Sequence, residues 1–295
     1  MLLSSLAAPI RRRASQRLFD VVLNTPGTLL GLIVVVFALG LVVLLGFRNN
    51  DGSLLGQGFT VANIVTAISD PLYARVVGRS LLIAGAVMAA TVVLAYPVAY
   101  YAAFHAGRWR GLVLFLVTLP FWTSYLLRVF AWKIVLAYNG VLNSALLELG
   151  IIRTPIMALL NTPAAVILTL AHAYAAFAVL PIFVALDRIP RNLGEAAADL
   201  GAHPWATFRR VILPMSMPGV LSAALVVFVP TVGDYVTPAL VGGPDSTMIG
   251  TIIQAQFGKA NDWPFGAAVS VLTLAIILCV VLAVQAADRR FGSRA

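Results

Sequence analysis

The chain has 295 residues, of which 61% are hydrophobic and only 11% charged, and its mean hydropathy is +0.96. About a quarter of the residues in an average soluble domain are charged, so this composition excludes an ordinary soluble protein. It also excludes disorder, which requires low hydrophobicity. The formal net charge is +9, a balance that in membrane proteins is typical of cytoplasmic loops. We therefore expect an all-α polytopic membrane protein.

Six stretches without a charged residue approach or exceed the length of a membrane-spanning helix, which needs about 20 apolar residues. They lie between Asp20 and Arg48, Arg79 and Arg108, Arg110 and Arg128, Arg153 and Asp187, Arg210 and Asp234, and Asp262 and Asp288. The stretch between Asp51 and Asp70 is also uncharged, but it is rich in Gly, Ser, Gln, Asn and Thr, and we interpret it as a loop. The sequence therefore predicts six transmembrane helices.

The distribution of basic residues predicts the orientation of these helices. Six spans place both termini on one side of the membrane, and most of the arginines, including Arg11, Arg12, Arg13 and Arg17, fall on that side. Because cytoplasmic loops are enriched in Lys and Arg, both termini should be cytoplasmic. The predicted organisation is a basic cytoplasmic segment 1–28, a transmembrane domain 29–288 with a long cytoplasmic loop 188–214, and a cytoplasmic tail 289–295.

Aromatic residues mark the end of the third predicted span. Phe121, Tyr125 and Arg128 share one helical face, and Trp122 lies beside it. Such a stripe is typical of packing or of an interfacial belt; the alternative is that Phe121, Trp122 and Tyr125 line a solute pathway. Arg128 would repel a cation, so we expect it to pair with a carboxylate or to extend toward the interface.

The outer loop 128–162 and the fourth span contain weaker signals. Asn139-Gly140 predicts a turn, and residues 142–149 could form a short interfacial helix. His172 is isolated within the fourth span, which favours a helix–helix hydrogen bond over a proton relay. No His, Cys or carboxylate pair has metal-ligand or catalytic spacing, and the single cysteine, Cys279, excludes an intrachain disulfide.

The cytoplasmic loop 188–214 contains residues that are typical of helix starts and helix ends. Asn192 and Glu195 have the spacing of a capping box, alanines follow, and Gly201 supplies a left-handed stop. Pro204 can open a second helix, which Pro214 should block. So short a helix is marginal in water and should need a partner; the alternative is a loop that merely connects two spans.

Asp234 ends the fifth charge-free stretch, after Pro230 and Gly233. A carboxylate at membrane depth is costly and is by default a functional candidate, and with aromatic neighbours such as Tyr235 it could bind a cation by charge pairing and cation–π contact. The alternative is that Asp234 only marks the outer membrane surface, because the span could end near Val232.

Three sequence features together resemble a known family. The run Glu195-Ala-Ala-Ala-Asp-Leu-Gly201, continued by Ile212-Leu-Pro214, resembles the EAA loop of permease subunits of bacterial ABC importers. Leu119-Pro-Phe-Trp-Thr-Ser-Tyr-Leu-Leu-Arg128 and Gly242-Gly-Pro-Asp-Ser-Thr-Met-Ile-Gly250 are similar to segments of spermidine/putrescine-type permeases. The likeness extends over nearly the whole chain from about Leu29 onward.

The resemblance implies a type I importer permease fold in the bacterial inner membrane and transport of a small cationic solute, a polyamine above all. It also implies four kinds of partner: two ATPase subunits, a second permease, usually a different chain, a periplasmic or lipid-anchored binding protein, and the lipid bilayer, with no nucleic acid. By match, Glu195, Ala196 and Gly201 form the core of the ATPase-coupling element, flanked by Arg191, Asp199 and Leu200. No phosphate-binding Gly-x4-Gly-Lys run is present, so we expect no cofactor and no enzymatic activity in this chain, with ATP and Mg bound by the partner ATPase.

Other functions stay open at this point. A related permease could carry an opine or an amino-acid derivative instead of a polyamine. A secondary transporter driven by protons through Asp234 or His172 is a second class. An intramembrane enzyme ranks last, because the polar residues are isolated rather than paired as acid and base.

Overall fold

The computed structural model describes residues 28–50 and 58–292, and its named elements are all helical. Within these residues six helices are long and apolar enough to cross a membrane, which matches the predicted number. They are Thr28–Gly46, Pro71–Phe104, Tyr125–Glu148, Pro163–Asp187, Pro204–Val232 and Trp263–Ala286. The third of them does not coincide with the predicted stretch between Arg110 and Arg128, where α4 (Arg110–Thr118) has only 9 residues. The predicted N-terminal segment 1–28 lies almost wholly outside the described residues, and the last helix continues to Gly292.

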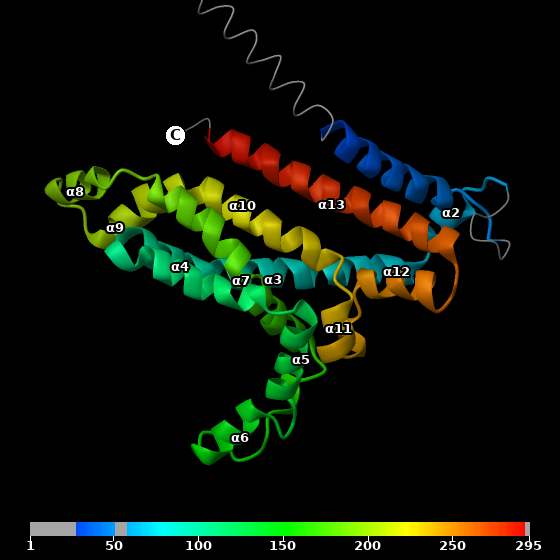
Figure 1. The fold of residues 1–295 in the computed structure, drawn as a ribbon, viewed down its shortest axis with the longest axis horizontal. Helices are drawn as coiled ribbons and strands as arrows, with labels where there is room; N and C mark the ends of the chain where they lie inside the picture. The colour runs from blue at the N-terminus through cyan, green and yellow to red at the C-terminus, as the bar shows by residue number, and fades with distance from the viewer. Residues whose placement is uncertain (1–27, 51–57, 293–295) are drawn as a thin grey trace, which may run out of the picture.

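The elements follow one another in chain order as long helices separated by short ones (Figure 1). After the first span come α2 (Ala62–Ser69), α3 (Pro71–Phe104), η1 (Gly107–Trp109), α4 (Arg110–Thr118), η2 (Leu119–Trp122), α5 (Tyr125–Leu136), α6 (Val141–Glu148), η3 (Met157–Leu159), α7 (Pro163–Asp187), α8 (Asn192–Asp199), α9 (Pro204–Thr207), η4 (Phe208–Ile212), α10 (Leu213–Val232), α11 (Val236–Val241), η5 (Pro244–Ser246), α12 (Ile249–Gly258) and α13 (Trp263–Gly292).

The core of the molecule is the packing of α3, α7 and α10, which run side by side (Figure 1). Val87, Leu170, Ile182 and Val227 are fully buried between them. Small residues allow the close approach that packing in lipid requires: a Cβ at Gly219 of α10 would lie 2.6 Å from the carbonyl oxygen of Pro181 in α7. We call these three packed helices, α3, α7 and α10, the frame.

The first span approaches α13 near its end. Most of its side chains between Leu29 and Leu44 are exposed, whereas Leu45 is buried and Gly46 approaches the backbone of Ala268 in α13. Figure 1 shows this helix beside α13. Because lipid tails are as apolar as these side chains, an apolar helix with this much exposed surface is compatible with a bilayer.

Two local expectations are wrong. Part of the stretch between Asp51 and Asp70 is helical, because α2 occupies Ala62–Ser69 and packs on α13. Pro214 does not stop a helix: a five-residue π-helix, η4, precedes it and the chain stays helical to Val232. Pro214 lies in the first turn of α10, where a missing N–H is tolerated, so the prolyl ring does not end the segment.

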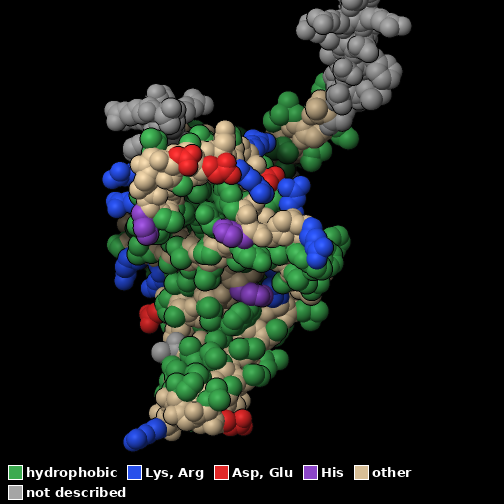
Figure 2. Space-filling model, turned by 90° about the vertical axis from the view of Figure 1, so that its left-hand side faces the viewer, with side chains coloured by type: hydrophobic (Ala, Val, Ile, Leu, Met, Phe, Trp, Pro, Cys, Tyr) green, Lys and Arg blue, Asp and Glu red, His purple; other side chains and the backbone are tan. Residues whose placement is uncertain are grey.

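The cytoplasmic loop of the sequence prediction forms one end of the molecule. There α8 and α9 project beyond the long helices, at the left in Figure 1. Figure 2 views this end and shows Lys and Arg side chains spread around it. Arg110 of α4 forms an ion pair of 3.4 Å with Asp187 of α7 at the same end. Both side chains are largely exposed, so this pair adds little stability.

Candidate functional site

The third span of the sequence prediction, between Arg110 and Arg128, is broken rather than continuous. α4 ends at Thr118, η2 follows, Thr123 is extended, Ser124 is not helical, and α5 begins at Tyr125. The expectation that Phe121, Tyr125 and Arg128 share one helical face is therefore wrong, because the helical repeat is interrupted between them. The break lies beside α7, whose Ala173 is near the middle of that 25-residue helix.

Arg128 satisfies the backbone that the break exposes. Its Nη2 donates to the carbonyl oxygens of Pro120 and Thr123, the latter at 3.1 Å, and its Nη1 donates to the carbonyl oxygen of Ala173 at 3.1 Å. The side chain is 9% exposed and forms no ion pair with any residue that the structure describes. The expectation that it pairs with a carboxylate or extends to the interface is therefore wrong: the five N–H donors of a guanidinium can serve several carbonyls at once, and the break supplies those carbonyls.

Asp234 lies directly after α10 in a closed polar network. α10 ends at Val232, as the sequence allowed, and Oδ1 of Asp234 accepts from the backbone N–H of Val236 at the start of α11. Oδ2 accepts from the hydroxyl of Tyr125 at 2.8 Å. The Asp234 side chain is only 8% exposed, and within the described part of the chain no basic group forms an ion pair with it. A buried carboxylate without a cation is an unusual and costly arrangement.

Thr237, which the sequence did not single out, completes this network. It belongs to α11 and lies 2.6 Å from the Tyr125 hydroxyl, oxygen to oxygen. It had no distinguishing spacing, because a threonine in an apolar helix is common. The start of α5 and the turn between α10 and α11 thus meet at one carboxylate, where they can present oxygen acceptors and an aromatic ring to a cation.

The remaining predicted pathway residues are at the surface of the chain. Phe121 is 50% exposed and packs edge-to-face on Phe177 of α7, with ring centroids 4.9 Å apart. Trp122 is 80% exposed, and Tyr235 is 47% exposed beside Asp234. The structure therefore brings Tyr125 to Asp234, but it does not bring Phe121 or Trp122 into contact with that carboxylate.

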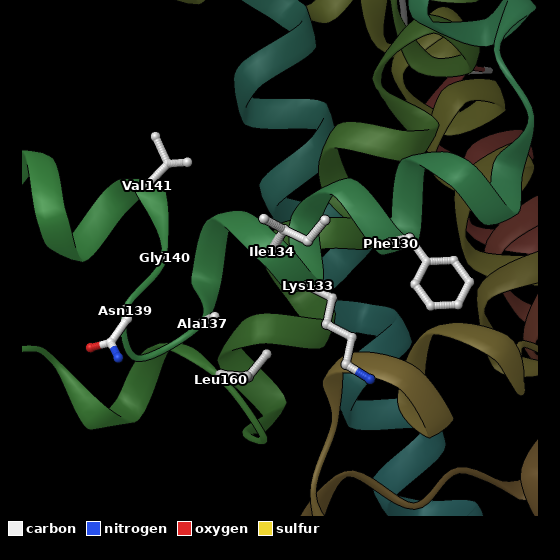
Figure 3. Close-up of a pocket in the computed structure, with 8 residues that line it drawn as sticks. All are labelled: Phe130, Lys133, Ile134, Ala137, Asn139, Gly140, Val141 and Leu160. Carbon is white, nitrogen blue, oxygen red and sulfur yellow. The ribbon is translucent and has the colours of Figure 1, made fainter.

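A separate open cavity of about 500 Å³ lies where α5 turns toward α6. Figure 3 shows its lining, with Phe130 and Lys133 extending from α5, Asn139 on the turn that follows and Val141 at the start of α6. The only charged group in this lining is the Lys133 ammonium. Such a surface is mostly apolar and would repel a cation, so it does not match the chemistry around Asp234.

The short helix predicted in the cytoplasmic loop exists and is α8. Gly201 has φ +78° and its N–H donates to the carbonyl oxygen of Ala198, which confirms the left-handed stop. The capping box does not form: Asn192 is the first helical residue, Arg191 occupies the cap position, and no side chain bonds there. An asparagine inside the first turn cannot reach the free N–H groups that a residue at the cap can.

α8 has few contacts with the rest of the chain. None of its residues is buried, and Leu200 at its end is 89% exposed. Arg191 is an exception among the coupling candidates, because its Nη2 donates at 3.4 Å to the carbonyl oxygen of Ala103 in the last turn of α3. The loop is therefore held at its start by Arg191, and within α8 Leu193 packs partly buried against the core.

The prediction that His172 forms a helix–helix hydrogen bond is confirmed. The Trp132 Nε1–H donates to Nδ1 of His172 at 3.1 Å, which joins α5 to α7. In the described ranges there is no group of three His, Cys, Asp or Glu side chains that could hold a metal ion.

Comparison with known proteins gives consistent results. Residues 95–293 match the family model described as the binding-protein-dependent transport system inner membrane component. The spermidine/putrescine transport system permease protein PotB of Escherichia coli K12 is 41% identical over 236 residues, which cover 80% of this chain and 85% of that protein. PotB of Haemophilus influenzae is 38% identical over 81% of this chain and 84% of its own length.

Two solved structures share the fold at lower identity. A bacterial ABC transporter involved in the import of alginate superposes with a TM-score of 0.68 at 18% identity, over 93% of this chain and 99% of that one. The MetNI methionine ABC transporter superposes with a TM-score of 0.55 at 23% identity, over 75% and 96% of the two chains. At these identities the likeness concerns the architecture of the helices.

Proposed function

The chain belongs to the binding-protein-dependent transport system inner membrane components, and from this we propose that it is the membrane subunit through which an ATP-driven importer moves a polyamine such as spermidine or putrescine. Membership makes it a multi-pass inner-membrane permease, the non-catalytic part of such a system. The observation that carries the polyamine is the identity of about 40% to spermidine/putrescine permeases over four fifths of the chain.

The chemistry around Asp234 supports a cationic solute. A protonated amine would supply the positive charge that the buried carboxylate lacks within the described chain, and Tyr125 and Tyr235 offer a hydroxyl and an aromatic ring beside it. Phe121 and Trp122, both exposed, provide further rings along the surface of the broken span. We assign these five residues to the solute pathway.

The geometry of α8 supports its role in ATPase coupling. A two-turn helix with no buried residue gains its stability from a partner, and the exposed Leu200 offers an apolar contact. Glu195, Ala196 and Gly201 form the core of the docking element in this proposal, with Asp199 and Leu200 beside it and Arg191 holding the loop to α3.

The proposed assembly follows from the family. Two ATPase subunits bind the end that carries α8, and a second permease, a different chain, completes the pathway in the bilayer. A periplasmic or lipid-anchored protein delivers the solute. ATP and Mg belong to the ATPase subunits. Both termini are cytoplasmic in this arrangement, which agrees with the arginines around the α8 end (Figure 2).

The test is transport by the complete importer in liposomes. The complex, with its ATPase subunits and binding protein, should accumulate labelled spermidine or putrescine when ATP is supplied, and the polyamine should stimulate ATP hydrolysis. Accumulation of an opine or an amino-acid derivative without any polyamine uptake would replace the proposed solute. Uptake driven by a proton gradient in the absence of ATP would contradict the importer itself.

A further inference from the structure

We propose that Arg128 is a positioning residue for the solute pathway: its guanidinium holds the broken third span in the shape that aims Tyr125 at Asp234. The inference rests on the proposed function, because it concerns the site assigned to the solute. It adds a residue that contacts neither Asp234 nor, in this proposal, the solute.

The break between η2 and α5 costs free energy in a membrane. A helix that is interrupted beside the middle of a neighbouring transmembrane helix leaves carbonyl oxygens without backbone partners, and the membrane offers no water to replace them. The Pro120 carbonyl accepts from the backbone N–H of Thr123 at 3.3 Å and from the Thr123 hydroxyl at 2.7 Å. The Thr123 carbonyl has lost its place in a helical repeat, because Thr123 is extended, and it needs a side-chain donor.

Arg128 lowers this free-energy cost by donating hydrogen bonds to the backbone around the break. Its Nη2 serves both carbonyls of the break and its Nη1 serves Ala173 of α7, so one planar group ties η2, α5 and α7 together. A buried guanidinium with no carboxylate partner in the described chain is expensive unless its donors are used. Here three backbone carbonyls accept from Nη1 and Nη2, whereas Nε has no hydrogen-bond partner among the described residues. The three bonds fix the direction in which α5 leaves the break.

The direction in which α5 leaves the break determines where the Tyr125 side chain lies. Tyr125 is the first residue of α5, and Arg128 follows it by three positions, so both lie on the same face of the helix. The Tyr125 hydroxyl reaches Asp234 and Thr237 from that position. If α5 were released from α7 and η2, the hydroxyl would move away from the carboxylate, although no group in contact with Asp234 had been changed.

The experiment is a double-mutant cycle in the complete importer, with the KM for polyamine uptake as readout. Arg128→Gln, which keeps a polar side chain but cannot bridge three carbonyls, should raise KM by about tenfold, as should Tyr125→Phe. The double variant should be no worse than either single variant, because both changes disable the same contact. Lys133→Gln, which removes an exposed cation from the same helix, is the matched control and should leave KM unchanged.

The outcomes separate the inference from the proposed function. Additive effects of Arg128→Gln and Tyr125→Phe on KM, or an unchanged KM in Arg128→Gln, would overturn the positioning role while leaving the solute site intact. An unchanged KM in both Tyr125→Phe and Asp234→Asn would overturn the proposed solute site itself. Should Arg128→Gln fail to assemble, Arg128→Lys serves in its place: it keeps the charge without the fork, so a raised KM supports positioning and a normal KM contradicts it.

Discussion

The hydroxyl of Tyr125 donates a hydrogen bond of 2.8 Å to Oδ2 of Asp234, and this contact joins the start of α5 to the turn between α10 and α11. The two residues are separated by 109 positions in the chain. The contact places a carboxylate, a phenol and Thr237 together at a point where two helices are interrupted. Four predictions concern Asp234, the α8 region and the contact between α7 and α10.

Removal of the Asp234 charge should weaken transport of a cationic solute. Asp234→Asn keeps an oxygen that can accept from the Val236 N–H but loses the negative charge, and a charge-assisted hydrogen bond contributes about 1.5–3 kcal/mol. We expect KM for polyamine uptake to rise by about tenfold or more. Uptake at several polyamine concentrations measures this. Asp234→Glu is the control, because it restores the charge, and equal kinetics for Asn and the unchanged protein would remove Asp234 from the pathway.

α8, the proposed coupling helix, should tolerate changes at Gly201 according to backbone conformation alone. No atom lies within 4 Å of a Cβ built at Gly201, but its φ of +78° disfavours L-residues. Gly201→Val should cost about 1–3 kcal/mol of local stability and reduce polyamine-stimulated ATP hydrolysis, whereas Gly201→Asn, a residue that visits this region, should retain most of it. ATPase assays with and without polyamine check this; equal loss in both variants would indicate that side-chain volume matters instead.

Charge reversal in α8 should uncouple the complex without unfolding it. Glu195 lies in the first turn of α8, which has no buried residue, so Glu195→Lys should leave insertion into the membrane intact. We expect loss of uptake and of solute-stimulated ATP hydrolysis, because the helix then presents the wrong charge to its partner. Glu195→Gln is the milder control. Normal uptake in the lysine variant would refute the coupling role of this residue.

The contact between α7 and α10 should be sensitive to a single methyl group. A Cβ at Gly219 would meet the Ala185 side chain and the Pro181 carbonyl, whereas a Cβ at Gly85 of α3 has no atom within 4 Å. Gly219→Ala should lower stability by about 1–3 kcal/mol through overpacking, and Gly85→Ala should not lower it, since alanine is the better helix former. Thermal unfolding in detergent compares them; equal melting temperatures would show that α7 and α10 can separate at no cost.

The features of this protein that depend on local composition, the number of spans and the helix α8, could be predicted from its sequence. The number of spans follows from the length of charge-free stretches, and α8 follows from its alanines and the stop at Gly201. Each of these signals is contained within one segment, because hydropathy and helix propensity act over a few turns of chain. The capping box at Asn192 was a local signal of the same kind, yet the helix began one residue early and the box did not form.

The tertiary structure alone decided the broken third span and the surroundings of Asp234. Leu119 to Arg128 reads as a continuous apolar helix, but its break is stabilised by the Arg128 guanidinium together with a carbonyl of α7, 45 residues away. Whether Asp234 faced lipid, water or protein depended in the same way on Tyr125 and Thr237. Hydrogen bonds between distant segments leave no periodic trace in the sequence, because the pairing energy belongs to the packed helices and to neither segment by itself.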